Sequence, residues 1–314
     1  MKTVLQTLTI SNFSASSGLI PQVVLSYQLF GCPLHTAPVV LVNHALTGNS
    51  NVAGREGWWN KIIGRELTID TDHCTVLCFN IPGNGFDGSL QPDAEVFITS
   101  DIARLFLAGL QQLQIEKLQL LIGGSLGGAI GWEMLALKPD LAEIFIPVAC
   151  DYRTSDWLHS QCLVQQFLLS HQDDPLQKAR AHAMLCYRTP ASLNDRFQNV
   201  RHAETRQLKS HDWLNFHGKT LEGRFSIQAY QLMNRLLMTV DADADKLKKI
   251  QAKIHLIAID SDLLFPAFEM KKAAGWLRQF NSCVTYQEIS SPHGHDAFLI
   301  EYPQLHSLLK SHLS

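Results

Sequence analysis

A serine flanked by glycines is the residue in this chain best placed to do chemistry. Ser125 occupies the centre of a G-x-S-x-G pattern, with Gly123 and Gly127 two residues to either side. The stretch from Leu118 to Gly123 reads as a strand, and the stretch from Ala129 to Leu137 reads as the helix after it. A serine on such a sharp strand-to-helix turn exposes its hydroxyl as a nucleophile. A glycine-rich turn that serves only close packing fits this pentapeptide equally well.

An acid and a histidine follow the serine in the chain order that a nucleophilic triad on such a turn requires. Asp262 lies just after a strand candidate that covers Lys253 to Ile259, and His295 lies after a second one that covers Cys283 to Ile289. The histidine would exchange the serine proton, and the carboxylate would fix the tautomer of the imidazole. Asp260 and His293 are close enough in sequence to compete for these two roles, and the residues alone leave both pairs open.

Acyl transfer also needs two donors for the oxyanion of its tetrahedral intermediate. The turn itself supplies one, the main-chain N–H of Leu126. We expect the second from Leu46, which lies in the segment His44-Ala45-Leu46-Thr47-Gly48 after the apolar residues Val39 to Val42. Without Ser125, this segment would read as an ordinary strand-end turn with a structural His44.

Strand and helix patterns alternate along most of the chain, which is typical of parallel βαβ units. The helical spacing of apolar residues is clearest from Ser100 to Leu113. We therefore predict an α/β fold with a mostly parallel central sheet flanked by helices. Residues 1–150 and 251–314 would form this core, and residues 151–250, where helical patterns dominate, would form an inserted lid. The early strands are expected at Val23–Leu29, Val39–Asn43, Thr75–Asn80, Leu118–Gly123 and Ile144–Ala149.

Composition excludes several classes of partner. The 314 residues carry a formal charge of -3, and nucleic-acid binding needs a basic surface that this balance lacks. No apolar run approaches the ~20 residues of a membrane helix. Met1 to Ile10 alternates like a strand and not like a signal peptide, so we expect a cytoplasmic protein. The seven scattered cysteines and fourteen histidines form neither a disulfide framework nor a metal-ligand spacing.

Five segments together resemble the homoserine O-acetyltransferases of the α/β-hydrolase superfamily, in that family's order. Four of them contain the residues discussed above. The fifth lies in the predicted lid and contains Arg180. They are His44–Gly48, Gly123–Gly128, Ala179–Pro190 with Leu193–Phe197, Asp262–Pro266 and Gly294–Leu299.

The resemblance implies an α/β-hydrolase fold and a role for each matching residue. Ser125 would be the nucleophile, His295 and Asp262 would complete the triad in preference to His293 and Asp260, and the amides of Leu46 and Leu126 would form the oxyanion hole. Arg180 would hold the carboxylate of the amino-acid substrate and Asp296 its ammonium group, a sensible arrangement for a zwitterion buried under a lid.

The resemblance also implies the reaction. An acetyl group would pass from acetyl-CoA to the side-chain hydroxyl of L-homoserine through an acetyl-serine intermediate, in methionine biosynthesis. Acetyl-CoA would be a substrate, and no metal or permanently bound cofactor is expected. The family also implies a homodimer that pairs through the lid.

Two segments depart from the family pattern and keep other activities open. The loop from Ile81 to Ser89 differs from that of better-known members, and Gly218 to Gln231 follows the second half of the usual lid only loosely. Because loops and lid shape the pocket, they affect substrate identity more than the acyl chemistry. A carboxylesterase, or a transferase that uses serine as acceptor or succinyl-CoA as donor, would share the same triad.

Overall fold

An eight-stranded sheet forms the centre of the molecule. The computed structural model describes residues 4–91 and 93–313. The strand order is β1-β2-β6-β3-β7-β8-β9-β10; β1, β2 and β6 pair antiparallel, and the remaining pairs are parallel. A separate small pair joins β4 (Ile63–Gly64) to β5 (Ile69–Asp70). The strands of the large sheet are β1 (Gln6–Ala15), β2 (Gly18–Gly31), β3 (Val39–Asn43), β6 (Thr75–Phe79), β7 (Leu118–Gly124), β8 (Ala142–Val148), β9 (Lys253–Ile259) and β10 (Val284–Ile289).

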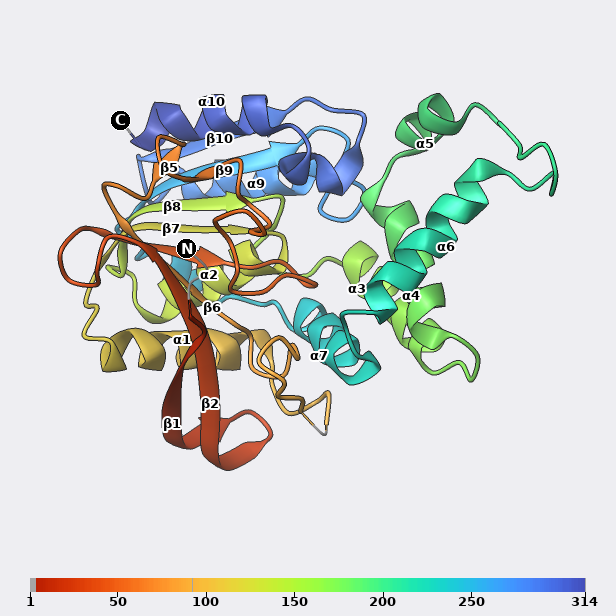
Figure 1. Ribbon diagram of the computed structural model, residues 1–314. Helices are drawn as coiled ribbons and strands as arrows, with labels where there is room; N and C mark the ends of the chain where they lie inside the picture. Colours follow the sequence, from red (N-terminus) through yellow and green to blue (C-terminus); the bar gives the residue numbers. More distant parts are fainter. Residues whose placement is uncertain (1–3, 92, 314) are drawn as a thin grey trace.

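The antiparallel hairpin differs most from the sequence prediction. β2 begins five residues before the predicted Val23 and ends two residues after the predicted Leu29. Its first part pairs only with β1 and projects past the rest of the sheet (Figure 1). β1 begins at Gln6 and runs five residues beyond the predicted end at Ile10, while residues 1–3 of that prediction lie outside the described residues. The predicted parallel sheet with flanking helices is confirmed.

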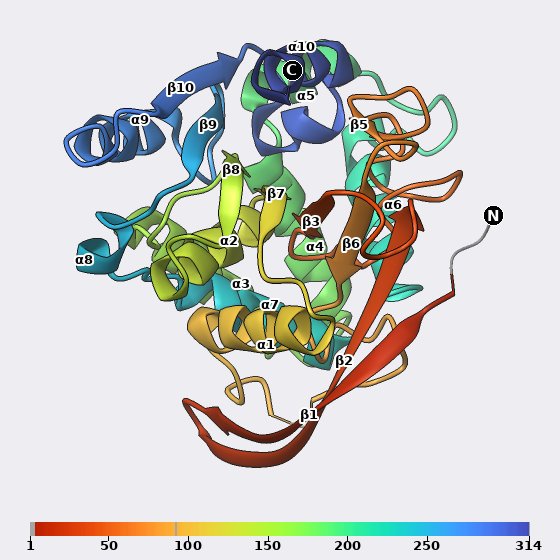
Figure 2. The ribbon, with the colours of Figure 1, turned by 90° about the vertical axis from the view of Figure 1, so that its left-hand side faces the viewer.

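The two faces of the sheet bury two separate apolar clusters. Along β3, Val39 and Leu41 belong to one cluster and Val40 and Val42 to the other, as the two-residue period of a strand requires. Helices α1 (Thr99–Gln112) and α2 (Leu126–Leu137) cover the first face, and α10 (Tyr302–Leu313) covers the second (Figure 2). Helix α9 (Ala267–Leu277) adds Met270, Ala274 and Leu277 to the first cluster. Burial on both faces explains why the parallel strands read as continuous apolar runs.

The chain between β8 and β9 is built from helices, which lie beyond the carboxyl ends of the parallel strands (Figure 1). We call α3 to α7 the lid. Three of its helices have a Ser or Thr N-cap that accepts a backbone N–H of the first turn, namely Ser155, Thr189 and Ser226. The helices are α3 (Asp156–Leu169), α4 (Pro175–Tyr187), α5 (Pro190–Phe197), α6 (Lys209–Glu222) and α7 (Ile227–Met238), and the short α8 (Ala244–Leu247) leads back to the sheet.

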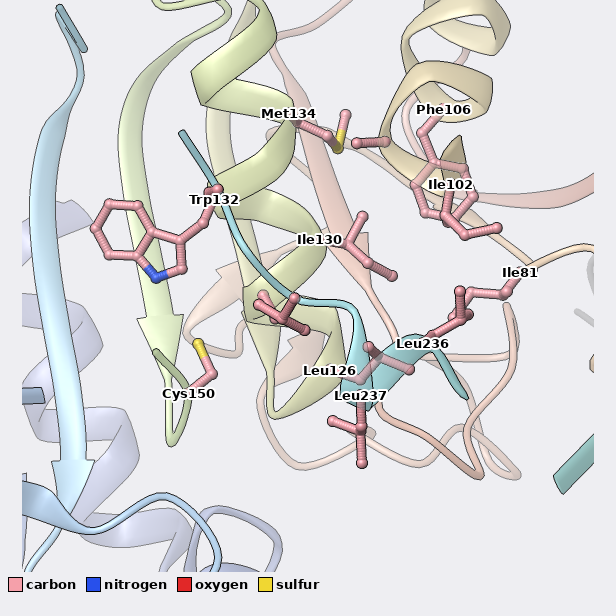
Figure 3. Packing of buried hydrophobic residues seen from close by; sticks show 14 of the residues in the cluster. Ile81, Ile102, Phe106, Leu126, Ile130, Trp132, Met134, Cys150, Leu236 and Leu237 are labelled. Carbon is pink, nitrogen blue, oxygen red and sulfur yellow. The ribbon is translucent and has the colours of Figure 1, made fainter. Parts of the chain in front are cut away.

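Helix α7 attaches the lid to the core. Its Leu236 and Leu237 join side chains of α1 and α2 in one buried cluster (Figure 3). The Thr99 hydroxyl at the start of α1 donates to the Leu236 carbonyl at 2.6 Å, and the Thr99 N–H donates to the Thr239 hydroxyl at 3.1 Å. These contacts hold α7, at the end of the lid, against α1 and α2. Among the described residues, none of the helices has the length and apolar character to cross a membrane.

Candidate active site

Ser125 has the backbone conformation of a strained turn between β7 and α2. Its φ of 55° and ψ of -129° fall where a residue with a Cβ is rarely found, and such strain is characteristic of a serine nucleophile on this type of turn. Its N–H donates to the Val148 carbonyl of β8 at 2.9 Å, which holds the turn against the neighbouring strand. The residue is 4% exposed. Leu126, the first residue of α2, has one of the amides that a helix start leaves without an intrahelical acceptor.

The glycine after this turn allows the start of α2 to touch the end of β3. A Cβ on Gly127 would lie 2.1 Å from the Asn43 carbonyl oxygen and 2.8 Å from that of His44, so no larger residue fits there. This close approach places the segment that contains Leu46 directly beside the serine turn. Leu46 is itself buried. The amides of Leu46 and Leu126, which are distant in sequence, thus belong to adjoining segments.

Asp262 and His295 form a buried hydrogen-bonded pair. Nδ1 of His295 lies 2.7 Å from Oδ2 of Asp262. The other carboxylate oxygen accepts the N–H groups of Leu264 and Phe265 at 2.7 and 2.9 Å, which fixes the orientation of the carboxylate. Because a carboxylate only accepts, the proton of the neutral imidazole lies on Nδ1 and Nε2 is left free as a base. The two residues are 5% and 4% exposed.

The pKa of His295 is raised above its ordinary value. Burial alone would lower it, but the charge of Asp262, the hydrogen bond to Asp262 and the charge of Asp296 together outweigh burial. Three aromatic rings surround the imidazole, with centroids 5.6 Å (Tyr187), 5.7 Å (Phe265) and 5.8 Å (Phe298) from its own. Phe298 also packs against the serine turn, since a Cβ on Gly124 would lie 2.7 Å from its ring. His295 belongs to a 3₁₀ helix over Gly294–Leu299, and this helix therefore lies against the turn that contains Ser125.

The two competing residues have other partners. The Asp260 carboxylate accepts the Ser290 hydroxyl at 2.8 Å and the Ser291 N–H at 3.0 Å, so it braces the loop that follows β10. The His293 ring bonds the Ser192 hydroxyl of the lid at 2.8 Å. The structure thus pairs His295 with Asp262 and leaves Asp260 and His293 in supporting contacts.

Arg180 and Asp296 differ in the partners that their charged groups already have. The Arg180 guanidinium lies over the Tyr187 ring, 5.4 Å from its centroid. Its Nε is buried and has no hydrogen-bond partner among the described residues. Asp296 forms an ion pair with Arg188, whose Nε lies 3.0 Å from the carboxylate Oδ2; the two side chains are 19% and 15% exposed. A buried guanidinium nitrogen without a partner is costly unless a ligand satisfies it.

Sequence reasoning missed Arg188. The residue stands in the segment Ala179–Pro190, just after the end of α4 at Tyr187 and about two helical turns beyond Arg180. A second arginine this close to Arg180 was the local signal of a second cation near the site. Its partner Asp296 is 108 positions away, so the ion pair itself could not be read from local pattern.

A small cavity adjoins the site. Its volume is about 20 Å³, enough for one water-sized group. Leu46, Tyr187 and Leu264 bring this cavity next to the segments that contain the serine turn, the imidazole and its carboxylate, and lid residues including Cys186 and Leu237 close the other side.

Comparisons with known proteins agree with this fold. Residues 38–145 match the family model described as alpha/beta hydrolase fold. A homoserine O-acetyltransferase from Cyclobacterium marinum is 30% identical over 305 residues, which cover 87% of this chain and 84% of that protein. Another from Thermus thermophilus is 30% identical over 350 residues, which cover 96% and 88%.

Solved structures give the same picture of the fold. The homoserine O-acetyltransferase of Staphylococcus aureus superposes with a TM-score of 0.82 at 25% identity, covering 100% of this chain and 96% of that one. The structure of esterase E22 superposes with a TM-score of 0.89 at 20% identity and covers 99% and 100%. Enzymes with two different activities therefore share this architecture. The fold alone does not identify the reaction, which depends on the residues of the site.

Proposed function

The chain belongs to the homoserine O-acetyltransferase family, and on that premise we propose that this enzyme transfers the acetyl group of acetyl-CoA to the side-chain hydroxyl of L-homoserine. The observation that carries the proposal is the pairing of His295 with Asp262 at 2.7 Å, at the same sheet edge as the strained Ser125. A serine, an imidazole held in one tautomer and two unpaired amides are the groups that acyl transfer needs.

In the first half-reaction, the Ser125 hydroxyl attacks the thioester carbonyl carbon while Nε2 of His295 takes the hydroxyl proton. The carbonyl oxygen becomes an oxyanion, which accepts hydrogen bonds from the N–H groups of Leu46 and Leu126. When the intermediate collapses, the C–S bond breaks and His295 returns the proton to the CoA sulfur. Loss of one such oxyanion donor typically costs roughly 3–4 kcal/mol of transition-state stabilisation.

In the second half-reaction, the hydroxyl of L-homoserine attacks the acetyl-serine carbonyl and His295 takes its proton. The same two amides stabilise the second oxyanion. The ester bond to Ser125 then breaks, the serine oxygen recovers a proton from His295, and O-acetyl-L-homoserine leaves. Methionine biosynthesis would consume this product. The reaction uses no resident cofactor, because acetyl-CoA enters as a substrate and leaves as CoA.

The lid side of the site supports an amino-acid acceptor. The acetyl donor is proposed from the name of the relatives, because the small cavity beside Leu46 is lined by none of Ser125, Asp262 and His295. Arg180, with its buried and unpartnered Nε, is suited to the acceptor carboxylate. Asp296 would receive the ammonium group, and the acceptor then shares that carboxylate with Arg188 or displaces the guanidinium.

Exclusion of water separates a transferase from a hydrolase on this architecture. The decisive experiment is therefore a thiol-release assay with acetyl-CoA, run with and without L-homoserine. We expect CoA release to require L-homoserine and to yield O-acetyl-L-homoserine in equal amount. The Ser125→Ala variant should release no CoA under either condition. CoA release at the same rate without an acceptor would show a hydrolase, and retained activity of Ser125→Ala would refute the assigned nucleophile.

A parallel panel tests the substrates. Succinyl-CoA in place of acetyl-CoA, and L-serine in place of L-homoserine, should each lower kcat/KM by at least tenfold, the range that a poorly fitting pocket normally gives. Preference for either substitute would change the proposed substrate while leaving the acyl chemistry intact.

We also place a homodimer contact on the lid. Leu163, Val164 and Phe167 share one face of α3 and are 44%, 37% and 64% exposed. An apolar stripe of this kind is a common interaction surface, and a second copy of the chain is the partner that the family implies. Sedimentation equilibrium should give a dimer that Phe167→Asp converts to a monomer; a wild-type monomer would refute it.

An enzyme that consumes acetyl-CoA is expected where this thioester is made and used, in the cytoplasm.

A further inference from the structure

The turn after β3 has one carbonyl that receives two hydrogen bonds. The oxygen of Ala45 lies 2.8 Å from Nδ1 of His44 and accepts the N–H of Gly48 at 2.9 Å. The turn is also tightly packed, since a Cβ on Gly48 would lie 2.9 Å from the Cβ of His44. The Ala45 carbonyl is therefore held in one direction.

The contacts of His44 define which of its nitrogens carries the proton. Nε2 faces the Ile81 N–H at 3.1 Å, and the Asn84 side-chain amide lies 3.4 Å away. A backbone N–H can only donate, so Nε2 accepts and the proton lies on Nδ1, where it donates to Ala45. His44 is 1% exposed, and burial lowers its pKa to about 4 against the opposing effect of the Ala45 hydrogen bond. The ring is thus a neutral donor toward the turn.

Fixing the Ala45 carbonyl also fixes the amide of Leu46. The two groups belong to one planar trans peptide, in which the C=O and the N–H point in opposite directions. With the oxygen turned toward His44 and Gly48, the N–H of Leu46 points away from them. Among the described residues, none accepts a hydrogen bond from this N–H. The amide is therefore oriented and available, which is the condition for an oxyanion donor.

A residue of the lid holds the Thr47 carbonyl of the same turn. Arg224 lies two positions after the end of α6 and donates from Nη1 to the Thr47 carbonyl at 3.0 Å. The carbonyls of Ala45 and Thr47 stand on either side of the Leu46 residue in sequence. One is held from the core by His44 and the other from the lid by Arg224.

We propose that His44 and Arg224 are positioning residues for the oxyanion hole: His44 holds the carbonyl of the peptide that contains the Leu46 N–H, and Arg224 steadies the same turn from the lid through the Thr47 carbonyl. The proposal rests on the acyl chemistry assigned to Ser125. It also connects the oxyanion hole to the lid, since Arg224 lies between α6 and α7.

The test uses two replacements of His44 that place their polar atoms differently. The side-chain amide of His44→Asn can donate from the position of Nδ1, whereas that of His44→Gln reaches the position of Nε2 and loses the donor to Ala45. We expect His44→Gln to lower kcat/KM for CoA release about 10- to 100-fold, part of the loss seen when an oxyanion donor is removed outright. His44→Asn should stay within about threefold of the wild type by the same reasoning.

Binding of methylboronic acid separates positioning from general damage. This acid forms a tetrahedral adduct with a serine nucleophile and so mimics the acetyl-transfer intermediate, whereas free CoA probes ground-state binding. For His44→Gln, affinity for methylboronic acid should fall by the same factor as kcat/KM, and affinity for CoA should not change. His255→Gln is the matched control, because His255 is also a buried, hydrogen-bonded histidine but lies on β9 away from the turn. It should leave methylboronic acid affinity unchanged.

Arg224 provides a second, exposed position that does not threaten the fold. Arg224→Met should lower kcat/KM and methylboronic acid affinity together by about 3- to 10-fold, and Arg224→Lys should restore part of the loss. The control is Arg201→Met, which removes another lid arginine whose hydrogen bond, to the Arg206 carbonyl, stays within the lid.

Three results would overturn the proposal. They are an unchanged methylboronic acid affinity in folded His44→Gln, equal losses in His44→Asn and His44→Gln, and CoA affinity that falls in parallel with methylboronic acid affinity. If His44→Gln does not fold, an unchanged affinity in Arg224→Met overturns it instead. Failure of the proposed function looks different, because it is seen in the unmodified enzyme, which would then release CoA at the same rate without L-homoserine or release none.

Discussion

The strand-end loops and the lid make different contributions to the site. The loops carry Ser125, Asp262 and His295, which are at least 95% buried and whose positions are fixed by short contacts to strands and backbone amides. The lid carries Arg180 and Arg188, which are partly exposed; Arg188 meets the core through one ion pair with Asp296, and Arg180 contacts the Tyr187 ring of its own helix. Rigid positioning suits groups that exchange protons, and adjustable contacts suit groups that admit and release substrate. We infer that the sheet determines the chemistry and the lid determines the substrate.

The largest effect should come from the carboxylate that orients the base. Asp262→Asn keeps the size of the side chain but would reverse the preferred tautomer of His295, and the corresponding change in a serine protease costs about 10⁴ in kcat. We expect a loss of about this size for CoA release. Steady-state kinetics and thermal unfolding, measured together, check that the fold survives.

The matched control for this prediction is Asp260→Asn. It removes the neighbouring carboxylate, which bonds Ser290 and Ser291 but not the imidazole. Its kcat should stay within about tenfold of the wild type, since it affects only a supporting loop. If the two variants exchanged these effects, Asp260 would be the acid of the triad.

Sequence closely predicted the strands that position the site. The limits of β3 and β9 agree with prediction to the residue, because strands buried on both faces are continuous apolar runs. Helix α2 begins at Leu126, three residues before the predicted Ala129. Gly127 and Gly128 disfavour a helix by propensity, but contact with Asn43 requires a glycine there and overrides that preference.

The contacts that refine the site join residues that are far apart in sequence. His44 meets Ile81 across 37 positions, and Arg188 meets Asp296 across 108. No periodicity or local motif encodes such pairs; they arise only when the sheet brings loop ends together under the lid. Family resemblance named residues at the motifs, but it could not report which side chain contacts which.

The second prediction concerns the lid. Arg180→Ala should raise the apparent KM for L-homoserine about 10- to 100-fold, because it removes a charge-assisted partner of the acceptor carboxylate. CoA affinity and the slow acetyl-CoA hydrolysis without acceptor should change little. Initial rates over a matrix of both substrate concentrations separate these terms.

Arg201→Ala is the control for Arg180, because it removes a lid guanidinium whose hydrogen bond stays within the lid. It should leave both KM values unchanged. A loss of acetyl-CoA hydrolysis in Arg180→Ala with no change in the homoserine KM would break the comparison, since a lid residue would then serve the chemistry.

The third prediction uses the pKa of His295. A general base must be neutral, and this pKa lies above the ordinary value of 6.5, so the acidic limb of kcat/KM should fall above pH 6.5. Asp296→Asn removes the smallest of the influences that raise it and should shift the limb toward lower pH. Rates of CoA release measured from pH 5 to 9 give the limb directly. A shift toward higher pH, or none, would mean that Asp296 does not act on the imidazole.

The smallest effect on activity is expected where α2 contacts the end of the lid. The effect on stability there should be clear. Glu133 of α2 is 5% exposed and accepts the Asp241 N–H at 3.2 Å, where the chain returns from the lid. Burial raises its pKa to about 7, against a lowering by that hydrogen bond. The folded protein keeps this proton at pH values where the unfolded chain has lost it, so stability should fall as pH rises from about 4.5 to about 7.

Glu133→Gln removes the charge and keeps an acceptor for Asp241, so its stability should not follow this slope. At pH 8 the variant should be more stable than the wild type by up to about 2–3 kcal/mol in urea unfolding, with the advantage gone near pH 4.5 and kcat unchanged at both. Glu143→Gln, on an exposed residue of β8, should change neither stability nor its slope with pH. A fall in kcat for Glu133→Gln at constant stability would mean that the contact between α2 and the end of the lid takes part in catalysis. The separate roles inferred for sheet and lid would then be wrong.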